Sequence, residues 1–172
     1  MKTDAPIVIA PYDPHWPITF AVERDRLAEQ LAPWLVGTIA HIGSTAVPGL
    51  AAKPVVDMMA PVSGLTESRP AIRDLVDTGW VHSEYRGDVM HWLCKPSPAH
   101  RTHHLHLVPF NGALWHDRIT FRDALRADAA LRDEYAALKS ELAVRFSDDR
   151  DRYTAAKTPF IRRALRDHRS AT

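Results

Sequence analysis

Three small polar residues, Gly43, Ser44 and Thr45, interrupt an apolar stretch of the chain at a point where chemistry could take place. Glycine lets a backbone approach a ligand closely, and the hydroxyl and N–H groups of serine and threonine can donate hydrogen bonds to a phosphate. The same residue types are also typical of a tight turn that caps a short helix. The pattern therefore indicates either a phosphate-binding turn or a purely structural one.

A single carboxylate, Asp57, follows in an apolar run of valine and methionine. Alternate side chains of a strand share a face, so we expect Val55, Asp57 and Met59 to point the same way. A carboxylate in such surroundings is costly unless a cation, a metal ion or hydrogen-bond donors lie close to it. Asp57 is therefore either a functional acid or one half of a structural ion pair, with Lys53 as the candidate partner.

Two histidines, His104 and His106, lie two residues apart in a run where they alternate with leucine. On a strand the leucines would face the core, and both imidazoles would share the opposite face. Two such imidazoles can bind a metal ion together or hold an anion when protonated, and Asp57 or His41 could complete a metal site. The alternative is a polar strand face that helices cover.

Two lysines could supply positive charge to a phosphate. Lys53 lies in the loop after the Gly-Ser-Thr turn, and Lys157 follows Tyr153 by four residues. Residues four apart share a helix face, so we expect these two side chains to lie together on the last helix, which Pro159 should bend. A lysine near a phosphate acts as a point charge, and an ordinary surface position is the alternative for each.

The remaining pattern predicts the elements that position these residues. Helical spacing of apolar residues is found at 18–31, at 65–78 and in three segments after Trp115. Strand-like runs are found at 7–9, 36–42, 55–62, 80–85, 89–94 and 102–108. The loop near Ser44 is too short for a parallel crossover, which favours a mixed or antiparallel sheet. We therefore expect an α+β fold, in which helices back the sheet and the C-terminal third is helical, as one domain over residues 1–172.

The composition argues against several classes of protein. The net charge is +1 with histidine neutral, so no overall field attracts nucleic acid or a membrane. Cys94 is the single cysteine, which allows no intrachain disulfide, and no apolar stretch is long enough to span a bilayer. No signal peptide is recognisable. We expect a cytoplasmic protein with no membrane partner and no strong sign of nucleic-acid binding.

The chain resembles the GrpB family through motifs that extend from about Ile7 to Leu165. These motifs are residues 11–17, the long run 41–54, residues 103–106, residues 121–123 and the pair Tyr153 and Lys157. The resemblance implies a nucleotidyltransferase-like fold of the DNA polymerase β type. Family members also occur fused to dephospho-coenzyme A kinase in some bacteria.

The resemblance also implies roles for individual residues. In that superfamily a Gly-Ser pair holds the phosphates of the nucleotide, while acids on the next strand and on a later strand hold two divalent metal ions. Gly43 and Ser44 match the phosphate motif, and Asp57 matches the first acid. Met59 replaces the second acid, and the histidine pair takes the place of the third. Thioether sulfur is a poor ligand for magnesium, whereas imidazole suits zinc, iron or manganese.

The sequence therefore predicts a nucleotidyltransferase-like protein that binds a nucleotide or another phosphorylated small molecule and could catalyse a transfer. The expected catalytic residues are Ser44, Asp57, His104 and His106. The expected phosphate or substrate contacts are His41, Gly43, Ser44, Thr45, Lys53, Tyr153 and Lys157. The expected ligands of a divalent metal ion (Mg, Mn or Zn) are Asp57, His104 and His106. Two alternatives remain open: a non-catalytic binding or regulatory module that kept the fold, and a metal-dependent enzyme of another class in which His41 joins these ligands.

Overall fold

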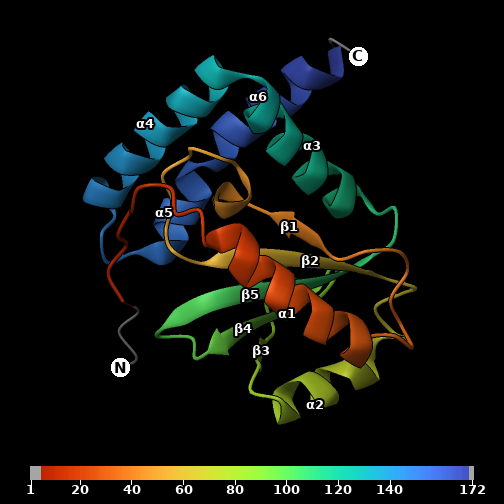
Figure 1. The fold of residues 1–172 in the computed structure, drawn as a ribbon. Coiled ribbons are helices and arrows are strands. Elements are labelled where there is room, and N and C mark those ends of the chain that lie inside the picture. Colours follow the sequence, from red (N-terminus) through yellow and green to blue (C-terminus); the bar gives the residue numbers. More distant parts are fainter. Residues whose placement is uncertain (1–4, 171–172) are drawn as a thin grey trace.

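A five-stranded mixed sheet with helices on both faces forms the fold in the computed structural model, which describes residues 5–170 (Figure 1). The strands are β1 (Ala40–Ile42), β2 (Val56–Val62), β3 (Val81–Ser83), β4 (His91–Pro96) and β5 (Arg101–Pro109). The helices are α1 (Trp16–Gln30), α2 (Arg69–Asp77), α3 (Ala113–Ala127), α4 (Ala129–Arg145), α5 (Arg150–Ala156) and α6 (Thr158–Ser170), with a short 3-10 helix η1 (Ser44–Ala46). Within the described residues, no helix combines the length and apolar character needed to cross a membrane.

The sheet has the strand order β1-β2-β5-β4-β3. Strand β2 is antiparallel to β1 and parallel to the central strand β5. The outer pairs β5–β4 and β4–β3 are antiparallel. The short loop after β1 therefore joins antiparallel neighbours, while the route from β2 to its parallel partner β5 passes through α2, β3 and β4. The predicted mixed sheet and α+β class are confirmed.

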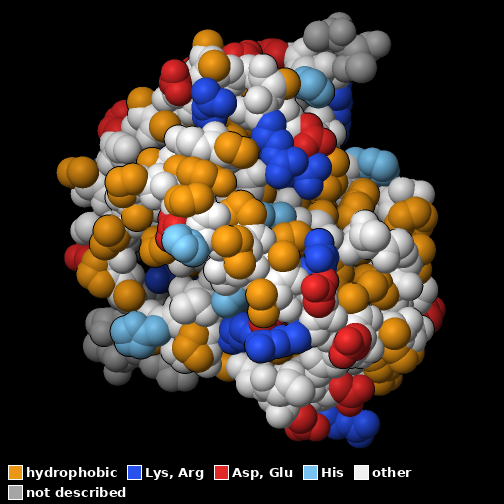
Figure 2. Space-filling model, in the orientation of Figure 1, with side chains coloured by type: hydrophobic (Ala, Val, Ile, Leu, Met, Phe, Trp, Pro, Cys, Tyr) orange, Lys and Arg blue, Asp and Glu red, His pale blue; other side chains and the backbone are white. Residues whose placement is uncertain are grey.

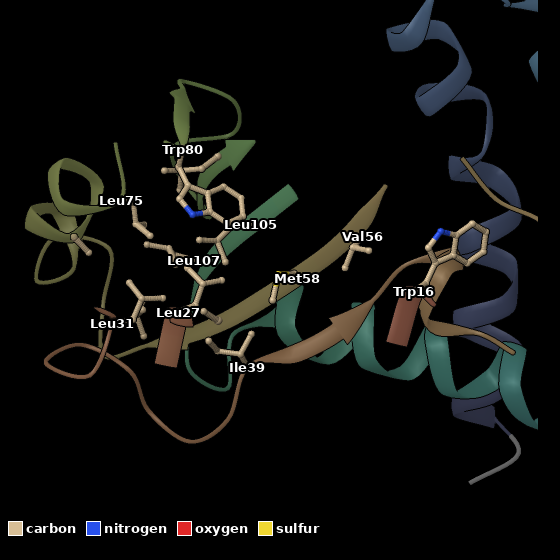
Figure 3. Packing of buried hydrophobic residues seen from close by; sticks show 14 of the residues in the cluster. Trp16, Leu27, Leu31, Ile39, Val56, Met58, Leu75, Trp80, Leu105 and Leu107 are labelled. Atoms are coloured by element: carbon tan, nitrogen blue, oxygen red, sulfur yellow. The ribbon is translucent and has the colours of Figure 1, made fainter. Parts of the chain in front are cut away.

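The two faces of the sheet pack against different helices. On one face Met58 and Leu105 contact residues of α1 and α2 (Figure 3). On the other face Met59 packs in a cluster that Trp115 of α3 covers. Because side chains alternate along β2, Asp57 shares the face of Met59, which we call the site face.

The N-terminal part of the chain differs from its predicted strands. Residues 7–9 form no strand, and the neighbouring Ala10 makes only an isolated bridge with Ala52. The strand predicted at 36–42 is shortened to β1, because Gly37 adopts a positive φ of 85° that an extended chain does not contain.

The last predicted helix is two helices, α5 and α6, and Pro159 lies in the first turn of α6. Proline has no N–H to donate to the preceding turn, and its ring clashes with the carbonyl four residues earlier. A new helix therefore begins at Thr158, and the predicted bend within one helix is wrong.

Gly43 joins β1 to η1 in a backbone conformation that is almost restricted to glycine, with φ 72° and ψ −172°. A Cβ atom at this position would lie 2.7 Å from Oδ2 of Asp57. The turn therefore requires glycine for two reasons, its backbone and the space that Asp57 occupies. It sets Ser44 beside the start of β2.

Gly43→Ala is expected to destabilise the protein more than Gly49→Ala does. Gly49 is a matched control because its φ is also positive, +79°, but a Cβ there would meet nothing within 4 Å. Each alanine should cost about 1–3 kcal/mol for a positive φ, and only Gly43→Ala must also displace the Asp57 carboxylate. Urea unfolding gives both free energies. Equal losses in the two variants would contradict the close approach of Gly43 to Asp57.

Candidate functional site

Asp57, His104 and His106 form one cluster on the site face. The register of the parallel strands places Asp57 beside His104 and Met59 beside His106. The Nδ1 atom of His104 lies 2.8 Å from Oδ1 of Asp57, and Nε2 of His106 lies 3.6 Å from the same oxygen. One potential ligand atom from each of the three residues lies within 4.8 Å of the others. The structure thus brings the three predicted metal ligands together.

The cluster holds Asp57 in its charged form. Burial raises the pKa of the Asp57 carboxyl, but the charges and hydrogen bonds of His104 and His106 outweigh burial and hold the pKa well below its ordinary value. Burial lowers the pKa of His106, against the opposing effect of Asp57. The Asp57 side chain keeps 28% of its surface exposed. A charged carboxylate beside an imidazole is therefore open to a ligand.

The donor atoms of this cluster fit a divalent metal ion. Nε2 of His104 and Nε2 of His106 are buried, and neither has a hydrogen-bond partner in the described part of the chain. Buried polar atoms without partners are costly, at about 1–3 kcal/mol each. A cation held beside the Asp57 carboxylate would give Nε2 of His106 a partner, whereas His104 meets the carboxylate through Nδ1. Two nitrogen ligands with one oxygen ligand favour zinc or manganese over magnesium.

Ser44 contacts a buried lysine that sequence reasoning missed. Lys139 of α4 donates a hydrogen bond from Nζ to Oγ of Ser44 at 3.0 Å, and it also donates to the carbonyl oxygen of Ala51. Its exposed fraction is only 2%. Burial, with added repulsion from Lys53, lowers the pKa of Lys139 to about 7. The Gly-Ser turn therefore lies next to a lysine that is largely shielded from water.

A signal for Lys139 was present in the sequence. The residue follows Tyr135 by four positions and precedes Leu142 by three, so it lies on the apolar stripe of its helix. Lysine is almost never fully buried unless it has a partner. A lysine inside an apolar stripe therefore indicates a buried partner, here Ser44.

Lys53 and Lys157 approach the same aromatic ring. Their Nζ atoms lie 5.1 Å and 4.4 Å from the centre of the Tyr153 ring. Burial lowers the pKa of Lys157 to about 7, and repulsion from Lys53 and Lys139 contributes, while Asp57 opposes the shift. The structure thus brings together the predicted Lys53, Tyr153 and Lys157 and adds Lys139. We call Lys53, Lys139 and Lys157 the lysine cluster.

His41 and Thr45 bond to each other instead of joining Asp57. His41 pairs with Met58 across β1 and β2, so its ring points away from the site face. The ring stacks on Phe20 at 4.7 Å, and its Nε2 lies 2.9 Å from Oγ1 of Thr45. Burial lowers the pKa of His41 to about 4. The idea that His41 completes the metal site is therefore wrong, because strand alternation puts it on the opposite face.

Solved structures show the same fold as this chain. Protein GrpB from Enterococcus faecalis superimposes with a TM-score of 0.84 at 29% identity, covering 94% of this chain and 96% of that one. The Cid1 poly(U) polymerase, in a structure described as bound to Mg 3′-dATP, gives a TM-score of 0.55 at 17% identity, over 80% of this chain and 44% of that one. At that identity the likeness shows the fold alone, and the fold is nucleotidyltransferase-like, as predicted.

Curated relatives extend over nearly the whole chain. A UPF0157 protein from Deinococcus radiodurans is 35% identical over 164 residues, which are 95% of this chain and 83% of the relative. A dephospho-CoA kinase from Mycolicibacterium paratuberculosis is 28% identical, and the match covers 94% of this chain but only 46% of that longer protein. The family model described as GrpB protein matches residues 6–167. The chain belongs to the GrpB family.

Proposed function

We propose that this protein binds a nucleotide or another phosphorylated small molecule together with a divalent metal ion, and that it transfers a group from that substrate. The observation that carries the proposal is the hydrogen bond from buried Lys139 to Ser44. It places a desolvated lysine at the Gly-Ser turn, beside the hydroxyl of Ser44. A phosphate is the anion that a hydroxyl and a lysine cation bind together.

The lysine cluster favours a substrate with more than one negative charge. Lys139 and Lys157 both have a pKa lowered to about 7, and repulsion from Lys53 contributes to each shift. A single carboxylate would neutralise one of these cations, whereas a di- or triphosphate carries enough charge for the whole cluster. Such a ligand would restore the full charge of both buried lysines.

The Asp57 cluster would hold the metal ion beside the phosphates. The Asp57 carboxylate and the imidazoles of His104 and His106 are the donors. A divalent cation would neutralise negative charge on the phosphate oxygens. In this account Asp57 and the two histidines bind and orient, while Ser44 and the lysine cluster position the phosphates.

A second candidate, binding without transfer, is favoured by Met59. This residue stands where the second metal-binding acid is expected, and its side chain is fully buried in the core. The site therefore offers one carboxylate where a two-metal mechanism uses several. Turnover separates the two candidates, because binding alone releases no product.

The affinity for ATP should depend on Lys139 in a pH-dependent way. The ratio of the wild-type affinity to that of Lys139→Gln is expected to be about tenfold or more at pH 6, and to approach one as pH rises past the lowered pKa of about 7. Below that pKa Lys139 carries its charge, and above it the charge is lost. Calorimetric titration at several pH values measures the ratio, in which the ionisation of ATP itself cancels.

Ser140→Ala is the control for this experiment, because this neighbouring side chain is exposed and, among residues 5–170, bonds only to the carbonyl of Ala136 on its own helix. It should keep the wild-type affinity at every pH. A ratio for Lys139→Gln that stays constant from pH 6 to the alkaline range would show that the Lys139 charge takes no part in phosphate binding.

Asp57→Asn should weaken binding of Mn²⁺ or Zn²⁺ by about tenfold or more, because it removes the charged donor of the cluster. Asp133→Asn is the matched control, since that carboxylate is 80% exposed on α4. Metal titration gives the affinity, and circular dichroism checks that both variants fold. A panel of nucleoside triphosphates assayed for pyrophosphate release then tests transfer. Turnover that Asp57→Asn leaves unchanged would refute the catalytic role of Asp57.

A further inference from the structure

A pocket of about 460 Å³ lies at the outer edge of the sheet beside β1. β1 is an end strand, so one of its edges pairs with no other strand in the part of the chain that the structure describes. The walls come from α1, from α3 and from β1 with the residues just before it. No lining residue belongs to the lysine cluster or to the Asp57 cluster. The pocket therefore lies outside the site already described.

Two arginines of α3, Arg122 and Arg126, form the polar end of the pocket. Arg122 donates from Nη1 to the carbonyl oxygen of His41 at 3.1 Å, and Arg126 donates from Nε and Nη2 to the carbonyl oxygen of Ala46 at 2.9 Å and 2.7 Å. Each guanidinium has five N–H donors, so these bonds leave others for a ligand. Backbone contacts thus hold both cations in place before any ligand binds, which lowers the cost of binding.

The charge at this end of the pocket is positive. Asp123 lies 2.8 Å from Nε of Arg122 and 3.7 Å from Nη1 of Arg126, so one carboxylate faces two guanidinium groups. Burial and the charge of Arg122 lower the pKa of Arg126. Figure 2 shows Lys and Arg side chains gathered beside α3, on the face of the molecule that also carries α1. An anion would balance the excess charge.

The remaining walls of the pocket are aromatic and aliphatic. The Phe20 ring stacks on the ring of His41, whose pKa of about 4 leaves it neutral, and Trp115 and Ile119 contribute from α3. The volume falls within the range of small-molecule sites, about 300–1,000 Å³. These walls suit a flat ring better than a polar chain.

We propose that this pocket binds a small aromatic anion, whose ring packs against Trp115 and Ile119 and whose carboxylate or phosphate is held by Arg122 and Arg126. The ligand combines one ring with one anionic group, because the pocket lining combines aromatic and aliphatic side chains with two guanidinium groups. Carboxylate and phosphate both match the planar fork of a guanidinium.

Calorimetric titration of the full chain with four probes tests this proposal. Indole-3-acetate supplies a ring with a carboxylate, and AMP supplies a ring with a phosphate. Indole lacks the charge, and inorganic phosphate lacks the ring. At least one aromatic anion is expected to bind about tenfold or more tightly than either fragment probe. The identity of the tighter probe distinguishes a carboxylate ligand from a phosphate ligand.

Two variants assign the binding to this pocket. Thr38→Trp fills the pocket from an exposed lining position, and the double variant Arg122→Gln, Arg126→Gln removes the cations. Both should weaken the aromatic anion about tenfold or more, while Arg162→Gln, at an exposed position on α6, should leave the affinity unchanged. Affinity that survives Thr38→Trp would overturn the proposal, as would the absence of saturable binding by either aromatic anion. AMP binding that survives both pocket variants belongs to the Ser44 region and counts against the pocket.

Discussion

The site depends on the Asp57 carboxylate staying charged where much of the surrounding water is excluded. Its partners are imidazoles from β5, the strand that pairs in parallel with its own. A burial cost of this kind is tolerated only when charge and hydrogen bonds compensate it. The same carboxylate takes the space that a side chain at position 43 would need, so residue 43 must be glycine as long as Asp57 lies there. One charge therefore constrains the turn after β1, the identity of residue 43 and the register between β2 and β5.

The positive charge of the site comes from a different part of the fold. The sheet carries Asp57 and the two histidines, whereas Lys139 and Lys157 come from α4 and from the end of α5. These helices pack beside the turn at Ser44, away from the α2 end of the sheet (Figure 1). The helical C-terminal third thus supplies two of the three lysines of the lysine cluster. Asp57 lowers the cost of burying Lys157, since it opposes the downward shift of that pKa. The negative charge on the sheet and the positive charge on the helices therefore stabilise each other.

The sequence predicts the sheet half of the site because strand periodicity is simple. Alternation alone puts His104 and His106 on one face, and the short loop after β1 makes the first two strands antiparallel. The family resemblance then pairs these residues with Asp57. The helical half is harder to predict, because Lys139 stands in an apolar stripe whose leucines and tyrosine indicate a face packed in the core. Its partner Ser44 is 95 residues away, and only tertiary packing brings the two together. The apolar run at 7–9 misled for a related reason: a strand needs a partner that only tertiary structure supplies, and within the described residues only the neighbouring Ala10 finds one, in a bridge to Ala52.

The most direct measurement is a crystal structure of the protein soaked with Mn²⁺ and a non-hydrolysable nucleoside triphosphate, with anomalous diffraction to locate the metal. The account predicts an anomalous peak within bonding distance of Asp57 and of at least one of His104 and His106. It also predicts phosphate density against Ser44 and the Nζ atom of Lys139. Ordered nucleotide whose phosphates lie elsewhere, or a metal-free Asp57 cluster in a crystal that binds Mn²⁺ at another position, would contradict it.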